Sequence, residues 1–334
     1  MRLWYHNPET FYNMIFKLVL FLATGVSNLL VVVIWLSKKN RTPVSILLSL
    51  ISIFDFLTIL AGATRSTMGY LVGTIHYVKE CYVVAIVGNL AIIFHTLSIF
   101  STTFLAIQRL FVCLFPFVGP RICKLRSTVI QAVASVCIII IWRSPQFMIS
   151  DIRGSTITDK DNTTQFICDV NHVLDDETVR KFFKADSMIR LFITGIAPAV
   201  VVSFCMFGCL ITIYRRKMST GQHRNNRTIF MLVLIMFIFV AGEFPSTVLN
   251  ACKAFMPNAK LWIFTNDGIQ FCNITLVLSY LLNVWVYIVM SKQFRESLHN
   301  MLCKKKEITE SVTSTSVSKE VRITSVSEKL NHEG

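Results

Sequence analysis

Long apolar runs separated by short polar segments make up most of the chain. Seven of these runs reach the roughly 20 residues that an α-helix needs to cross a bilayer. We expect spanning helices at Met14–Leu36, Val44–Leu71, Val83–Phe111, Ser127–Ile149, Arg190–Tyr214, Thr228–Cys252 and Asn266–Met290. The pattern therefore predicts an all-α membrane protein, a seven-transmembrane helix bundle.

The polar segments between the runs differ in the sign of their charge. In the segment between the fourth and fifth runs, from Asp151 to Glu177, acids outnumber bases. The segments after the first, third and fifth runs contain no acid, and their bases are Lys38, Lys39, Arg41, Arg121, Lys124, Arg126, Arg215, Arg216, Lys217, Arg224 and Arg227. By the positive-inside rule these basic segments are cytosolic. We therefore expect a multi-pass protein of the plasma membrane, with its amino terminus outside and its carboxyl terminus in the cytoplasm.

Composition agrees with one membrane domain and no separate catalytic domain. Only 16% of the residues are charged and 53% are hydrophobic, whereas about a quarter of a soluble domain is charged. The formal net charge of +14 follows from the basic cytosolic segments, so we expect no nucleic-acid partner. The predicted organisation is a short extracellular amino terminus (1–13), the bundle (14–290), an amphipathic eighth helix (291–303) and a disordered cytoplasmic tail rich in Ser and Thr (304–334).

Isolated polar residues interrupt five of the apolar runs. They are Asn28, Asp55, Arg109, Glu243 and Asn283. A polar group inside a bilayer is costly, and it usually faces the protein interior and serves a function. The rise of about 1.5 Å per residue places Asn28, Asp55, Asn283 and also Ser98 roughly 10 to 16 Å above the cytosolic ends of their helices. These side chains could form one buried cluster, either a hydrogen-bonded water network or a site for a hard cation.

The order and spacing of these residues resemble the rhodopsin-like family of G-protein-coupled receptors. The resemblance extends from about Ala23 to Leu302. Its motifs are Asn28, Asp55, Gln108-Arg109-Leu110 in place of an Asp-Arg-Tyr box, Pro116, Pro198, Pro245, Asn283-Val284-Trp285-Val286-Tyr287 in place of Asn-Pro-x-x-Tyr, and Phe294 of the eighth helix. The resemblance implies that Ser279 completes the polar cluster, which binds sodium and water in the family. It also implies that Arg109 and Tyr287 take part in coupling to a heterotrimeric G protein.

Several positions depart from the family pattern. Gln108 replaces the acid that would pair with Arg109, Val284 replaces the proline of the seventh helix, and Glu243-Phe244-Pro245 replaces the usual Cys-Trp-x-Pro. These features are most similar to receptors for FMRFamide, myosuppressin and sex peptide. Invertebrate chemoreceptors of serpentine class W are similar to that branch as well. We therefore expect a receptor for a short neuropeptide, with a small-molecule chemoreceptor as the alternative.

A second polar level lies farther out. His95 and Glu243 both lie roughly 21 to 22 Å from the cytosolic ends of their helices, so contact between them is plausible. Arg65, Arg190, Asn250 and Gln270 lie near the outer mouth, and with the deeper pair they form the predicted ligand-binding set. Arg65 and Arg190 could instead extend to lipid headgroups, and Glu243 could turn to backbone or water. A transporter or channel would show inverted repeats or paired midplane charges, and neither is visible.

Cysteines and modification sites complete the expectations. No spacing of Cys or His suggests a metal site. Cys81 and Cys168 both fall on the outer, oxidising side and could form a disulfide, and Cys252 with Cys272 is a second possible pair. Asn162 begins a glycosylation sequon, and Cys303 is a candidate for palmitoylation. The Ser and Thr residues of the tail are either candidate phosphosites for a receptor kinase and arrestin or a plain linker.

Overall fold

The structure is a computed structural model that describes residues 8–37, 41–72, 78–158, 164–172, 177–219, 223–256, 265–301 and 303. Among these residues, seven helices are long and apolar enough to cross a membrane. Six of the spans lie in α2 (Pro8–Leu36), α3 (Pro43–Val72), α4 (Val78–Leu114), α6 (Leu125–Ile149), α9 (His223–Phe255) and α10 (Asn266–Met290). The remaining span joins α7 (Glu177–Arg190), the π-helical turn η2 (Leu191–Ile196) and α8 (Ala197–Ser219). The predicted seven-helix bundle is confirmed.

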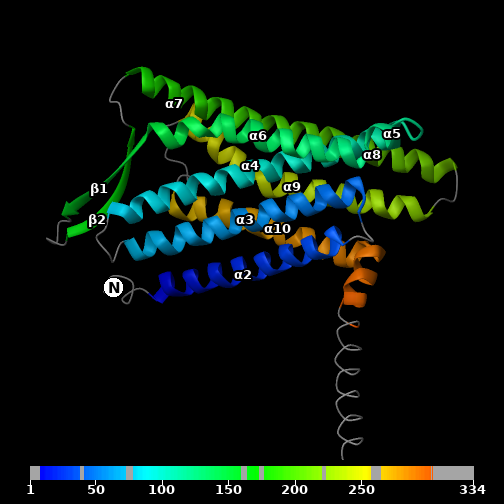
Figure 1. The fold of residues 1–334 in the computed structure, drawn as a ribbon, viewed down its shortest axis with the longest axis horizontal. Coiled ribbons are helices and arrows are strands. Elements are labelled where there is room, and N and C mark those ends of the chain that lie inside the picture. The colour runs from blue at the N-terminus through cyan, green and yellow to red at the C-terminus, as the bar shows by residue number, and fades with distance from the viewer. Residues whose placement is uncertain are drawn as a thin grey trace, which may run out of the picture. The chain divides into compact units, whose positions relative to one another are not determined.

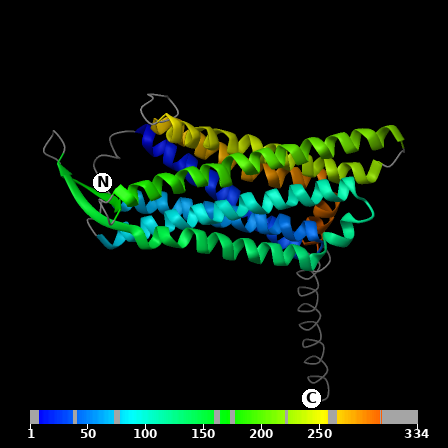
Figure 2. The same cartoon turned by 90° about the horizontal axis from the view of Figure 1, so that it is seen from above.

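The helices pack side by side around α4 (Figures 1 and 2). α4 contacts α3, α6, α8 and α9, and α10 packs against α9 and α2. Where α3, α4 and α6 meet, Phe54, Ile93, Leu97 and Ile139 form a buried apolar cluster. Because α4 has neighbours on most of its sides, polar side chains that it carries are directed at other helices rather than at lipid.

Local sequence explains where several helices begin, bend and end. Thr42 and Ser45 exchange hydrogen bonds at the start of α3, as capping residues do. α4 ends at Leu114, two residues before Pro116. In the fifth span, the π-helical turn lies directly before Ala197 and Pro198. Proline has no backbone N–H to continue the helical ladder, so a local rearrangement of the ladder at this position has a clear cause.

A β-hairpin lies between α6 and α7, and the sequence analysis did not predict it. Strand β1 (Ser150–Thr158) pairs antiparallel with β2 (Thr164–His172), from Ser150 opposite His172 to Thr158 opposite Thr164. The acidic segment was interpreted only through its charge. We call the end of the bundle that carries this hairpin, where α2 and α10 begin, the hairpin end. The opposite end, where α4 finishes, is called the Arg109 end.

The chain divides into two compact units, Met1–Met290 and Ser291–Gly334. In the second unit, residues 292–301 are helical, and the Ser291 hydroxyl accepts a hydrogen bond from the Phe294 backbone N–H at 3.1 Å. Phe294 is buried, whereas Lys292, Glu296 and His299 are exposed. The tail from 304 to 334 lies outside the described residues.

Candidate functional site

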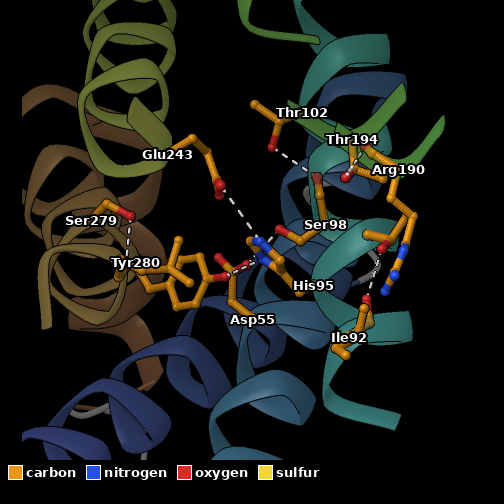
Figure 3. A network of polar contacts seen from close by, with 12 residues as sticks. Asp55, Ile92, His95, Ser98, Thr102, Arg190, Thr194, Glu243, Ser279 and Tyr280 are labelled. Atoms are coloured by element: carbon orange, nitrogen blue, oxygen red, sulfur yellow. Dashed lines mark hydrogen bonds and ion pairs between the residues drawn. The ribbon is translucent and has the colours of Figure 1, made fainter. Parts of the chain in front are cut away.

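A histidine near the middle of α4 connects three helices. Nε2 of His95 lies 3.5 Å from Oε2 of Glu243 on α9, and Nδ1 lies 2.8 Å from the hydroxyl of Tyr280 on α10 (Figure 3). One neutral tautomer satisfies both contacts, because a proton on Nε2 faces the carboxylate while Nδ1 accepts from the tyrosine. The structure thus brings together His95 and Glu243, which depth matching had paired, and adds Tyr280 to them.

A second buried pair lies beside this contact. Ser98 on α4 donates a hydrogen bond to Oδ1 of Asp55 on α3 at 2.5 Å, and both side chains are almost fully buried. His95 and Ser98 are three residues apart, so they share one face of α4. Asp55 also lies within electrostatic range of His95 and Glu243. Helices α3, α4, α9 and α10 therefore meet in one buried group, which we call the central network: Asp55, His95, Ser98, Glu243 and Tyr280 (Figure 3).

The other expected members of the polar cluster do not bond directly to the central network. Asn28 donates to the carbonyl of Thr24 at 3.0 Å, and Ser279 donates to the carbonyl of Leu276 at 2.7 Å, so each bonds within its own helix. Asn283 is buried, and its Oδ1 has no hydrogen-bond partner in the described part of the chain. A buried oxygen without a donor is costly, so this atom has room for a bond that the protein itself does not make.

Close packing fixes α9 against α10 next to Glu243. A Cβ atom built on Gly242 would lie 2.5 Å from Cβ of Ser279, a separation that real side chains do not adopt. Gly242 is therefore needed for the two helices to approach here. This approach helps to place Glu243 on α9 and Tyr280 on α10 within reach of the same histidine.

The four residues expected at the mouth lie in different surroundings. Arg65 is exposed and lies over Gly88 of α4. Arg190 pairs with Asp186 one turn earlier, with Nε 3.0 Å from Oδ2. Asn250 is exposed, and Gln270 lines a cavity between α2 and α10. Among the described residues, the contacts of these side chains do not join them into one pocket with the central network.

Arg143 on α6 is a buried cation that the sequence analysis overlooked. It is 2% exposed, and its three guanidinium nitrogens have no hydrogen-bond partner among the described residues. Asp186 and Arg190 lie within electrostatic range of it. The available signal was a lone arginine near the end of an apolar run, the same signal that identified Arg109.

At the Arg109 end, Gln108 and Arg109 face different surroundings. Nε2 of the buried Gln108 donates to Oγ1 of Thr128 at 3.1 Å and to Oε1 of Gln131 at 3.2 Å, which holds α4 against α6. Arg109 is half-buried, and its Nε has no hydrogen-bond partner among the described residues. The residue in the place of the family's acid therefore anchors α4 to α6, and no acidic partner of Arg109 is seen within those residues.

Two further contacts at this end join other helices. Tyr287 of α10 is fully buried, and its ring meets Trp35 of α2 edge-on, with ring centroids 6.2 Å apart. Nη2 of Arg227, at the start of α9, donates to the carbonyl of Val289, at the end of α10, at 3.1 Å. The sequence analysis counted Arg227 among the basic cytosolic residues and did not predict this bond, because a bond to a backbone carbonyl leaves no sequence signal.

The predicted modification sites lie mostly outside the described residues. Asn162 and the side chains of Cys81 and Cys168 are among these undescribed positions. Cys303 is described and exposed. Cys252 and Cys272 are both free thiols, so the second possible disulfide is wrong. Nor do the described residues contain a group of three or more His, Cys, Asp or Glu side chains that could hold a metal ion.

Comparison with known proteins gives two matches. The family model described as 7 transmembrane receptor (rhodopsin family) matches residues 27–287, which includes every residue of the central network. The sex peptide receptor of Drosophila melanogaster is 25% identical over 321 residues, and this alignment covers 88% of the present chain and 72% of that receptor.

Proposed function

The chain belongs to the rhodopsin family of seven-transmembrane receptors, and on this premise we propose that it binds an extracellular peptide at the hairpin end and activates a heterotrimeric G protein at the Arg109 end. As a member of this family it is a multi-pass receptor of the cell surface rather than an enzyme. The observation that carries the proposal is the contact of His95 with Glu243 and Tyr280, because it makes three helices respond to one change in charge or position.

Charge at the hairpin end supports a peptide as the ligand. Arg65 and Arg190 supply positive charge there and Asp186 supplies negative charge, while Glu243 adds a carboxylate deeper in the bundle. A peptide carries groups of both signs, whereas few small odorants do. Arg143 adds a buried guanidinium with unused donors, and a carboxylate of the ligand would satisfy it bidentately. The similar receptor of Drosophila has a peptide in its name.

The central network suggests how binding is transmitted. A ligand group that attracts or displaces Glu243 changes its contact with His95, and α9 is free to respond at Pro245, where the helix lacks one backbone hydrogen bond. Movement of α9 relative to α4 and α10 would then open the Arg109 end. Only a ligand that binds the two arrangements with different affinity can shift the balance between them.

The Arg109 end supports a G-protein partner and the proposed orientation. Arg109 has unused hydrogen-bonding capacity, and Arg215 and Arg227 are exposed beside the helices that end or begin there. Basic segments favour the cytosol, so we propose that this end is cytoplasmic and the hairpin end is extracellular. Antibody access to epitope tags at either terminus of intact cells would test this orientation in the plasma membrane.

Water or a sodium ion is proposed to complete the central network. The carboxylate of Asp55, the hydroxyl of Ser98 and the orphaned Oδ1 of Asn283 are oxygen ligands that suit a hard cation. If sodium binds, agonist affinity should fall as sodium replaces potassium in the buffer, and Asp55→Asn should remove this dependence. The same dependence in the variant would favour a water network.

The predicted modifications and the remaining partners belong to this proposal. A Cys81–Cys168 disulfide would tie the segment of β2 to the start of α4. Asn162 would be glycosylated, Cys303 palmitoylated, and the tail phosphorylated by a receptor kinase for arrestin. Mass spectrometry of the receptor from transfected cells reports on these modifications. Non-reduced samples report on the disulfide, deglycosylated samples on the glycan, and hydroxylamine-treated samples on the palmitoyl group. A free thiol at either Cys81 or Cys168 would contradict the disulfide.

The main test is a ligand screen with matched variants. Cells that express the chain and a promiscuous G protein are exposed to a library of short peptides, in amidated and free-acid form, and to a set of small odorants. We expect a calcium response to peptides that Glu243→Gln weakens, while Phe244→Leu, at the exposed neighbouring position, leaves it unchanged. A response to odorants alone would identify a chemoreceptor. Ion or solute flux without G-protein signalling would reject the receptor mechanism.

A further inference from the structure

A cavity of about 80 Å³ lies between α2 and α10. It belongs to the first span and the last span of the bundle, and none of its lining residues is a member of the central network. Its lining residues from α2 are Lys17, Leu20 and Phe21, and those from α10 are Gln270, Asn273, Ile274 and Val277. Gln270, which the sequence analysis assigned to the ligand pocket, therefore lines a different space.

The lining changes from polar to apolar with depth. Both helices begin at the hairpin end, so early residues lie near the membrane surface. Lys17 and Gln270 are two and three residues from the starts of their spans, at Ile15 and Asp267, whereas Val277 lies roughly 10 Å deeper than Gln270. Side chains on a helix lean toward its amino terminus. The lysine and amide groups thus point toward the surface, above an apolar floor.

Both walls of the cavity are flanked by exposed apolar side chains. Phe16 and Val19 on α2 and Phe271 and Leu278 on α10 are each at least 40% exposed. In a membrane protein such side chains contact lipid, so lipid-facing surface adjoins the cavity on both helices. Within the described part of the chain, Lys17 makes no ion pair or hydrogen bond. A lysine this close to the membrane surface can extend its ammonium group to the phosphate of a lipid headgroup.

We propose that a phospholipid of the leaflet at the hairpin end binds between α2 and α10. Its phosphodiester lies at Lys17, Gln270 and Asn273, and part of one acyl chain lies against Phe21, Ile274 and Val277. The ammonium and the two amide groups are donors that match phosphate oxygens. Water alone fits the floor poorly, because a buried water needs two to four polar partners. The volume holds a short stretch of chain, and the rest of the lipid remains in the bilayer.

The proposal can be tested on the full chain without knowledge of its agonist. Receptor purified in detergent is incubated with phosphatidylglycerol, phosphatidylcholine or diacylglycerol with the same acyl chains, and retained lipid is counted by native mass spectrometry. We expect both phospholipids, but not diacylglycerol, to remain bound. Lys17→Leu should weaken this retention about tenfold, the loss of one charge-assisted hydrogen bond, and Lys17→Arg should preserve it.

A matched variant and a second measurement make the result decisive. Lys253→Leu removes an exposed lysine near the hairpin end of α9 that does not line the cavity, so it should retain lipid as the wild type does. In the unmutated chain, a phospholipid with a diazirine on its acyl chain should label Phe21 and Ile274 more than Val19 and Leu22. Any one of three results would overturn the proposal. They are equal loss of bound phospholipid in Lys17→Leu and Lys253→Leu, equal labelling of all four residues, and cross-linking to a second copy of the chain.

Discussion

The centre of the bundle and the Arg109 end use polar residues in different ways. In the centre, His95 contacts Glu243 and Tyr280, and Ser98 beside it bonds to Asp55, so α4 is linked to α3, α9 and α10. At the Arg109 end, Gln108 bonds to α6 while Arg109, its neighbour in sequence, lacks a hydrogen bond at Nε within the described residues. Buried polar groups that satisfy one another favour one arrangement of helices, whereas a cation with unused donors is available to a partner. The difference supports the proposal that the centre sets the state of the receptor and that the Arg109 end transmits it to the G protein.

The largest effect should come from removing the reporting residue. Arg109→Ala should abolish G-protein activation, because the cation at the end of α4 is lost, while agonist binding at the distant hairpin end survives. Radioligand or fluorescent-ligand binding and nucleotide exchange on a G protein, measured on the same membranes, separate the two. Arg121→Ala, which removes a cation from the nearby short helix α5 (Gly119–Ile122), is the control. Loss of agonist binding in Arg109→Ala would contradict the division between centre and end.

The next effect concerns the packing that places the central network. Gly242→Ala adds a methyl group that would lie 2.5 Å from Cβ of Ser279, so α9 and α10 must separate. We expect the free energy of unfolding to fall by about 1–3 kcal/mol, as for other overpacked sites, together with a change in basal signalling. Gly62→Ala is a matched control, because nothing lies within 4 Å of its added Cβ. Thermal denaturation followed by fluorescence-detected size exclusion would show the difference, and equal melting of the two variants would refute the packing argument.

A double-mutant cycle measures the link within the central network. His95→Asn and Glu243→Gln should each shift agonist potency or basal activity, and the double variant should cost less than the sum of the two. A coupling of about 1 kcal/mol is typical of residues in contact. Agonist dose–response curves for the four proteins at matched surface expression give this value. Strict additivity would show that the 3.5 Å contact carries no energy and that Glu243 acts alone.

The smallest effect is expected at the bond between α9 and α10 near the Arg109 end. Arg227→Gln removes the donor to the Val289 carbonyl, which frees the start of α9 and should raise basal signalling. The bond is exposed, so its worth is at most about 1 kcal/mol. Arg215→Gln, which removes another exposed cation at the end of the fifth span, serves as control. Lower or unchanged basal nucleotide exchange in Arg227→Gln would reject a restraining role for this bond.

Helix depth predicted part of the central network and missed the rest for identifiable reasons. His95 and Glu243 were paired because their depth along two helices is equal, and depth follows from sequence alone. Tyr280 was missed because an aromatic residue in an apolar run gives no separate signal. The depth argument also grouped Asn28 with Asp55, and the family resemblance added Ser279, yet both bond within their own helices. Depth gives the position of a side chain along the membrane normal, whereas the rotation of its helix decides which neighbour the side chain faces.

The sequence by itself determined the seven spans, because length and hydrophobicity suffice for a helix that must satisfy its backbone within a bilayer. It also determined which residues were too polar to face lipid. Tertiary structure decided which helix each of these residues faces. Glu243 of α9 meets His95 of α4, and α9 packs closely on α10 at Gly242. Gln270 turns to the cavity beside α2, and the acidic segment pairs into a hairpin. Such contacts depend on the rotation and packing of several helices at once, and no single segment of the chain encodes them.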